Sequence, residues 1–103
     1  MANNKRRYRS RIQIVADILE IARSGSRKTR IMYLGNLSFE VLQKYLDMLV
    51  NLGLIKFESE DDRTYVATER GRQFLEDFHE LEKYSEIVES KRRALQTSLG
   101  VVV

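Results

Sequence analysis

The basic side chains of this sequence occur in clusters, and clustered basic side chains favour the binding of phosphate groups. Arg27, Lys28 and Arg30 stand together where a short helix is expected to begin. The N-terminus of a helix also attracts anions, because its first backbone N–H groups have no partner within the helix. We therefore predict that this cluster contacts a phosphate backbone. The alternative is that one member, Arg30 above all, pairs with an acid of its own chain.

A second basic group precedes the first expected helix. Residues 5–11 carry five positive charges and one aromatic ring, that of Tyr8. A tail of this kind can follow phosphates or enter the minor groove of a duplex, and it can also be no more than a solvated tail. The residues predicted to contact nucleic acid are Lys5, Arg6, Arg7 and Arg9.

A third group of polar residues lies on the helix expected after Ser38. Gln43 and Lys44 carry hydrogen-bonding groups that can meet base edges or phosphates in a major groove, with an ordinary solvated helix face as the alternative. Two carboxylates on the same helix repel phosphates, so this is not a strongly basic reading surface. Ser38 itself and Arg63, the one base in an otherwise acidic turn, complete the predicted DNA contacts.

The sequence lacks the parts of a catalytic site or a metal site. It contains one His, no Cys and no Gly-rich phosphate loop. Adjacent acids such as Asp61-Asp62 and Glu76-Asp77 are expected to be solvated, and His79 has no second metal ligand at a useful spacing. We therefore predict that the protein is not an enzyme and uses neither a cofactor nor a metal.

The net charge of +3 conceals an uneven distribution of charge along the chain. Residues 1–56 hold eleven Lys and Arg against four acids, whereas residues 57–103 hold seven against eleven. A basic first part suits a polyanion, and an acidic second part suits contact with protein. We find no signal peptide and no apolar run of the ~18 residues that a membrane span needs. We therefore expect a cytoplasmic, nucleoid-associated protein without membrane contact.

Apolar residues at helical spacing predict three helices in the first half of the chain. The first begins near Ser10 and stops before Gly25, which can adopt a left-handed conformation. The second covers residues 27–34 and is broken by Gly35-Asn36.

The third helix is capped by Ser38 and ends at Gly53. Its expected buried stripe consists of Phe39, Leu42, Tyr45, Leu46, Leu49 and Leu52. Outside this stripe, Met32, Tyr33, Met48 and Tyr65 are expected in the core or at its boundary. The alternative for Tyr33, Tyr45 and Tyr65 is that their rings stack on bases.

Two short apolar runs, residues 54–58 and 64–68, follow the helices and read as a β-hairpin with a polar turn. Thr68 then caps a helix of about 30 residues. Three helices, a hairpin and a further helix are the order of a winged helix-turn-helix, an α+β and mainly helical fold. We therefore expect a winged-helix domain over residues 1–68 and a coiled-coil helix over residues 69–103.

One stretch of the chain is more specific than the order of its elements. It reads Lys28-Thr29-Arg30-Ile31-Met32-Tyr33, then Asn36-Leu37-Ser38, and it continues with Tyr45-Leu46, Leu49 and Gly53-Leu54-Ile55. From about residue 12 to its end, the chain closely resembles the archaeal ten-kilodalton winged-helix chromatin proteins, the ten-a family. The resemblance implies DNA binding without a cofactor, and a long C-terminal helix that pairs in an antiparallel coiled-coil dimer. The acidic turn of the hairpin departs from the simplest pattern of that family.

The long helix carries an apolar stripe that the rest of the chain is too small to cover. About 30 helical residues extend roughly 45 Å, whereas a compact domain of the first ~68 residues is only about 25–30 Å across. We therefore expect a second copy of the chain to cover the projecting end, which makes the protein a homodimer. The predicted interface residues are Phe74, Phe78, Leu81, Ser85, Val88, Arg92, Leu95 and Leu99.

Arg92 favours an antiparallel pairing of the two helices. In a parallel pair it would face the same residue of its partner across the seam. In an antiparallel pair that aligns Phe74 with Leu99, Arg92 faces Leu81 and its long side chain can reach Glu82 of the partner subunit. This arrangement would place two basic heads at opposite ends of a stalk, on the order of 40 Å or more apart.

The charge pattern and the resemblance together predict a dimeric protein that binds double-stranded DNA with weak sequence preference and organises it. A sequence-specific transcription regulator on the same scaffold is the main alternative. A third reading is a protein–protein interaction module without DNA binding, because the hairpin turn and the third helix carry carboxylates.

Overall fold

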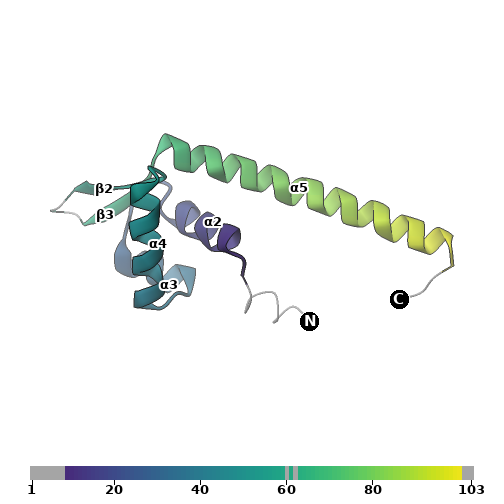
Figure 1. Ribbon diagram of the computed structural model, residues 1–103, viewed down its shortest axis with the longest axis horizontal. Coiled ribbons are helices and arrows are strands. Elements are labelled where there is room, and N and C mark those ends of the chain that lie inside the picture. The colour runs from purple at the N-terminus through teal and green to yellow at the C-terminus, as the bar shows by residue number, and fades with distance from the viewer. Residues whose placement is uncertain (1–8, 60, 62, 101–103) are drawn as a thin grey trace.

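The computed structural model describes residues 9–59, 61 and 63–100, and it consists of a small head and one long helix that leaves it (Figure 1). The molecule measures 62 × 26 × 19 Å. The elements follow in the order α2 (Arg11–Ile21), β1 (Ser26–Arg27), α3 (Lys28–Gly35), α4 (Phe39–Asn51), β2 (Ile55–Ser59), β3 (Thr64–Ala67) and α5 (Glu69–Ser98). None of the helices in the described ranges is long and apolar enough to cross a membrane.

Side-chain caps set the starts of three helices. Ser10, Ser38 and Thr68 each accept a hydrogen bond from a backbone N–H three residues further along the chain. A cap of this kind stabilises a helix by ~1 kcal/mol. The caps predicted at Ser38 and Thr68 are confirmed. Asn36, in a left-handed conformation with φ of 54°, ends α3 and turns the chain toward α4.

The head closes around an apolar core to which α2, α3, α4, the start of α5 and the sheet all contribute. Burying an aliphatic side chain of this kind contributes roughly 1.5–3 kcal/mol. The largest fully buried side chains are Ile18, Leu19, Ile31, Leu42, Leu46, Leu49, Ile55 and Leu75. Met32, Met48, Tyr45 and Tyr65 pack against this core, as predicted.

Three residues expected in the core or at its boundary lie at the surface instead. Tyr33 is 84% exposed, Phe39 58% and Leu52 49%. Tyr33 points away from the core, because two residues along a helix place it nearly opposite the buried Ile31. Phe39 is the first residue of α4 and Leu52 its C-cap, so both lie beyond the part of α4 that the core covers.

The sheet of the described chain has three strands rather than the predicted two. Its order is β1-β3-β2, and both pairings are antiparallel. In β1, Ser26 pairs with Tyr65 and Arg27 with Thr64, and the buried Ser26 hydroxyl donates a hydrogen bond of 2.8 Å to the carbonyl of Ile21. The second helix accordingly starts at Lys28 and not at Arg27. A strand of two residues has no room for an alternating pattern, so the sequence did not reveal it.

α5 crosses the rest of the head at close range, and a glycine permits the approach. A Cβ atom added at Gly71 would lie 2.2 Å from the carbonyl oxygen of Leu54. One turn later, Leu75 is fully buried in the core. The first turns of α5 therefore belong to the head, and only the later turns form a stalk.

A polar contact joins α2 to α5 at the edge of this crossing. The Glu20 carboxylate accepts a hydrogen bond of 2.9 Å from Arg23 and lies 3.4 Å from Nε2 of His79, which is exposed as predicted. Hydrogen bonding from Arg23 holds the pKa of Glu20 below its ordinary value and raises the pKa of Arg23. Since the pKa of this acid is lowered on folding, its contribution to stability is present at neutral pH and is lost as the pH falls through the lowered value.

Replacing Gly71 with alanine should destabilise the head, because the new methyl group would collide with the backbone of Leu54. We expect the free energy of unfolding to fall by about 1–3 kcal/mol, the usual cost of overpacking. Urea denaturation followed by circular dichroism measures it. The matched control is Gly35→Ala, where the nearest atom would be 3.5 Å away and the helix gains a better former. Equal stability of G71A and the wild type would contradict the close crossing.

Candidate nucleic-acid interface

The basic cluster lies where the sheet meets the helix-turn-helix. Arg27 ends β1, Lys28 begins α3 and Arg30 follows in its first turn. Arg27 and Arg30 are exposed, and Lys28 is half-buried. Within the described ranges, none of the three forms an ion pair. The pairing of Arg30 with an internal acid, which the sequence left open, is therefore not observed among these residues.

The structure brings two of these bases together with Arg63 around an open hollow. Arg63 is the last residue of the turn between β2 and β3 and has a left-handed conformation, with φ of 53°. On the floor of the hollow, the rings of Phe57 and Tyr65 meet across the two strands with their centroids 5.1 Å apart. The hollow has a volume of about 620 Å³ and is lined by Arg27, Lys28, Thr29, Phe57, Arg63 and Tyr65. Arg30 lines a second hollow, which shares Arg27 and Thr29 with the first.

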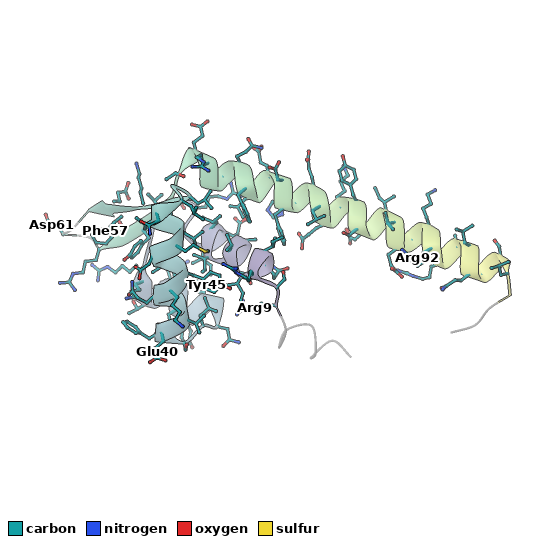
Figure 2. The ribbon with its side chains drawn as sticks, in the orientation of Figure 1. Arg9, Glu40, Tyr45, Phe57, Asp61 and Arg92 are labelled. Carbon is teal, nitrogen blue, oxygen red and sulfur yellow. The ribbon has the colours of Figure 1, made fainter. Side chains whose placement is uncertain are left out.

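An aromatic floor with cations around it suits the sugar-phosphate backbone of a nucleic acid. Phosphates are the commonest hydrogen-bond partners of proteins on DNA, and Arg and Lys supply many of these contacts. In Figure 2, Phe57 lies at the base of the wing formed by β2 and β3, beside α4, and Asp61 lies at the wing tip. The wing tip is thus acidic, whereas the base of the wing faces basic side chains.

A chain of polar contacts links α3 to the exposed face of α4. The Lys28 ammonium donates a hydrogen bond to Oε1 of Gln43, and Nε2 of Gln43 donates one of 2.9 Å to Asp47. The same ammonium lies 4.0 Å from the centre of the Phe39 ring. These contacts orient the Gln43 amide, which keeps one lone pair and one N–H for an outside partner. The Asp47 carboxylate, which the sequence marked as repelling phosphates, is therefore itself hydrogen-bonded to Gln43.

Arg9 has a structural position that the sequence did not anticipate. Its guanidinium forms an ion pair of 2.7 Å with Asp17 and donates hydrogen bonds to the carbonyls of Gly35 and Asn36, at 2.8 and 3.3 Å. The Arg9 side chain is only 20% exposed. Arg9 therefore ties the start of α2 to the turn between α3 and α4, and its predicted contact with DNA competes with these internal bonds.

The remaining predicted contacts are spread over the head. Ser38 uses its hydroxyl to cap α4, and Lys44 is exposed on the same helix. Lys5, Arg6 and Arg7 lie outside the described residues, so their predicted contact with nucleic acid stays a prediction.

Of the aromatic residues of the interface, only Tyr65 was considered from the sequence as a possible base-stacking residue, and the core was preferred for it. Phe57 was assigned only to a strand, and Phe39 to the core. Strand alternation was the available signal, since Phe57 follows the buried Ile55 by two residues and so shares its face of the sheet. The position of α3 beside that face follows from β1, which the sequence did not reveal.

A second candidate surface lies on α5, beyond the head. Phe74 and Phe78 pack against the core of their own head, so the free part of the predicted stripe begins at Leu81. From Leu81 to the end of the described chain, every residue is exposed, including Ser85 and Arg92 (Figure 2). The large exposed apolar side chains of this segment are Leu81, Tyr84, Ile87, Val88, Leu95 and Leu99. Tyr84 and Ile87 were not predicted, and they widen the stripe on one side.

Comparison with known proteins identifies the class of protein that this fold defines. The chain belongs to the winged helix-turn-helix family, whose model matches residues 8–86. It is 38% identical over 96 residues to the uncharacterized protein MJ0287 of Methanocaldococcus jannaschii, in a match that covers 88% of this chain and 93% of that protein. Its structure resembles that of Sso10a-2, a DNA-binding protein from Sulfolobus solfataricus, with a TM-score of 0.77 and 32% identity over 88% of this chain and 97% of that one. The predicted fold and the resemblance to archaeal winged-helix proteins are confirmed.

Replacing Arg9 with alanine should lower stability rather than DNA affinity. The substitution leaves Asp17 with only the Gln13 amide as a partner and removes a donor from two carbonyls, and we expect the free energy of unfolding to fall by about 1–2 kcal/mol. Urea denaturation measures this. The control is Arg11→Ala, because Arg11 is exposed and its guanidinium meets the sulfur of Met48 rather than a carboxylate.

The same variant distinguishes the internal role of Arg9 from the predicted phosphate contact. The logarithm of the DNA-binding constant falls linearly with the logarithm of salt concentration, and removing one phosphate contact flattens that slope by about 0.9. We expect R9A to keep the wild-type slope. A flatter salt-dependence slope with unchanged stability would show instead that Arg9 contacts a phosphate of the DNA.

Proposed function

We propose that this protein binds double-stranded DNA through its head and that its stalk joins two heads into a DNA-organising dimer with weak sequence preference. The observation that carries the first half is the hollow beside α3, where Arg27, Lys28 and Arg63 surround an aromatic floor. None of these bases forms an ion pair among the described residues, and Arg27 and Arg63 are exposed, so their side chains can meet a polyanion. The DNA-binding activity stated for Sso10a-2 supports the same assignment.

In the docking that we propose, α4 enters the major groove and one DNA strand follows the hollow beside the wing. Helices of this motif present their N-terminal residues to base edges. Gln43 and Lys44 then face the groove, while Arg27, Arg30 and Arg63 meet phosphates. Phosphate contacts position a protein without reading sequence, which fits a weak sequence preference.

The exposed stripe of α5 supports the second half of the proposal. A surface helix without a partner does not normally present so many large apolar side chains along its outer turns. An identical helix that runs antiparallel covers this stripe, and Arg92 can then extend toward an acid at the edge of the seam. Because Phe74 and Phe78 are used within the head, the paired segment is centred on Val88 and its neighbours.

The spacing of the two heads gives the dimer its architectural role. Antiparallel stalks hold the heads on the order of 40 Å or more apart, beyond one turn of DNA at roughly 34 Å. One dimer then contacts two separated stretches of one duplex or bridges two duplexes. Such binding needs no cofactor and no catalysis, and it places the protein on the nucleoid.

A sequence-specific regulator on the same scaffold is the second candidate, and one observation favours it. The Gln43 amide is held in one orientation by Lys28 and Asp47, as a base-reading group must be. Footprinting on genomic DNA separates the two functions. Diffuse protection supports the architectural protein, and discrete protected sites support the regulator.

Removing charge from the hollow should weaken binding to random duplex and reduce its dependence on salt. For the double variant Arg27→Gln and Arg63→Gln, we expect the slope of log binding constant against log salt concentration to be flatter by about 1.8. Each phosphate contact accounts for about 0.9 of that slope. Fluorescence anisotropy at several salt concentrations measures it. The control is Lys83→Gln with Arg93→Gln, which removes the same charge from exposed positions of α5. If the wild type fails to bind any duplex at low salt, DNA binding is the wrong function.

Placing acids on the stripe should separate the subunits. Leu81→Asp with Val88→Asp puts two carboxylates into the apolar seam, and we expect sedimentation equilibrium at about 10 μM to change from a dimer to a monomer mass. Lys83→Asp with Ser90→Asp adds acids to the opposite face of the same helix and should leave a dimer. The acid substitutions lie beyond the head, so the head should stay folded in both variants, and only the first should lose the stability that association contributes. A wild type that already sediments as a monomer would contradict the proposed pairing.

A further inference from the structure

Phe39 is an aromatic residue whose exposure the fold does not require. It begins α4, the helix that would read the major groove, and 58% of it is exposed. The core of the head is complete without it, since α4 fills that core with Leu42, Leu46 and Leu49. An exposed phenyl ring at the leading end of a reading helix is a feature that DNA binding itself can explain.

The surroundings of Phe39 form a compact group with both apolar and polar parts. The Lys28 ammonium lies 4.0 Å from the centre of its ring and so braces one face of it. Lys28 also donates a hydrogen bond to Gln43, one helical turn beyond Phe39 on the same side of α4. A single lysine therefore fixes an apolar surface and an amide next to each other.

An A·T base pair presents matching groups in the major groove. Adenine offers the N7 acceptor and the N6 donor, which an Asn or Gln amide satisfies, and thymine offers a methyl group to apolar side chains. The Gln43 amide retains one N–H and one lone pair after its internal bonds, which is what adenine requires. Guanine and cytosine present no methyl group at this edge, so Phe39 gains nothing from them.

We propose that Phe39 contacts a thymine methyl group in the major groove and that, together with Gln43, it gives this protein a preference for A·T pairs. This inference rests on the proposed DNA binding through α4, and it adds the kind of base pair that α4 prefers. Phosphate contacts still supply most of the affinity, so the preference is modest and agrees with an architectural protein. The proposed contact involves one defined group of the DNA, the C5 methyl group of thymine.

Deoxyuridine tests the proposal, because it differs from thymidine only by lacking this methyl group. We would measure binding by anisotropy to a duplex of alternating dA and dT and to the same duplex with dU in every dT position, at one salt concentration. One contacted methyl group is worth about 0.8 kcal/mol, so we expect affinity about fourfold weaker for the dU duplex. Phe39→Ala should bind the two duplexes equally.

Val41→Ala is the matched control, because Val41 is a neighbouring exposed apolar residue on a different face of α4. It should keep the fourfold difference, and Phe39→Leu should keep most of it. Circular dichroism confirms that each variant is folded, as the exposure of Phe39 leads us to expect. Equal binding of both duplexes by the wild type, or an undiminished fourfold difference in F39A, would overturn the inference and leave DNA binding in place. Failure to bind either duplex at low salt would instead overturn the proposed function.

Discussion

The apolar stripe on α5 extends beyond the part of the helix that the head covers, and the rest of this structure depends on that constraint. The head buries Leu75 and partly covers Phe78, and from Leu81 onward it leaves the described residues exposed. Apolar surface exposed along a helix is costly in water, and the hydrophobic effect favours whatever partner removes it. In the proposed dimer, association becomes part of how this small chain is stabilised, and a core of modest size becomes sufficient.

The two candidate surfaces lie on different parts of the molecule. The wing and α5 extend from opposite sides of the head (Figure 1), so a partner on the stalk leaves the basic hollow open. Bases gather around α3, whereas the free part of α5, residues 81–100, holds three acids and four bases and so has little net charge. Pairing of the stalks and binding of DNA can then occur together, which is what a protein that connects DNA segments needs.

Sequence patterns predicted the helices and the long stalk well, because helical periodicity and caps such as Ser38 and Thr68 are local signals. They missed β1, whose two residues are held by pairing with β3, a strand distant in the sequence. The same nonlocal contact decides that Arg27 and Arg63 share a hollow. Arg9 shows the opposite error, since its charge indicated phosphate while its bonds with Asp17 and two carbonyls arise only in the folded head.

Small-angle X-ray scattering of the wild-type protein tests most directly whether the stalk joins two heads. One chain is 62 Å long, and an antiparallel partner adds a second head beyond the end of α5. The account predicts the mass of two chains, two separated maxima from the heads and a longest dimension on the order of 90 Å, from a rise of about 1.5 Å per residue. The mass of one chain with a longest dimension near that of the single chain would contradict it.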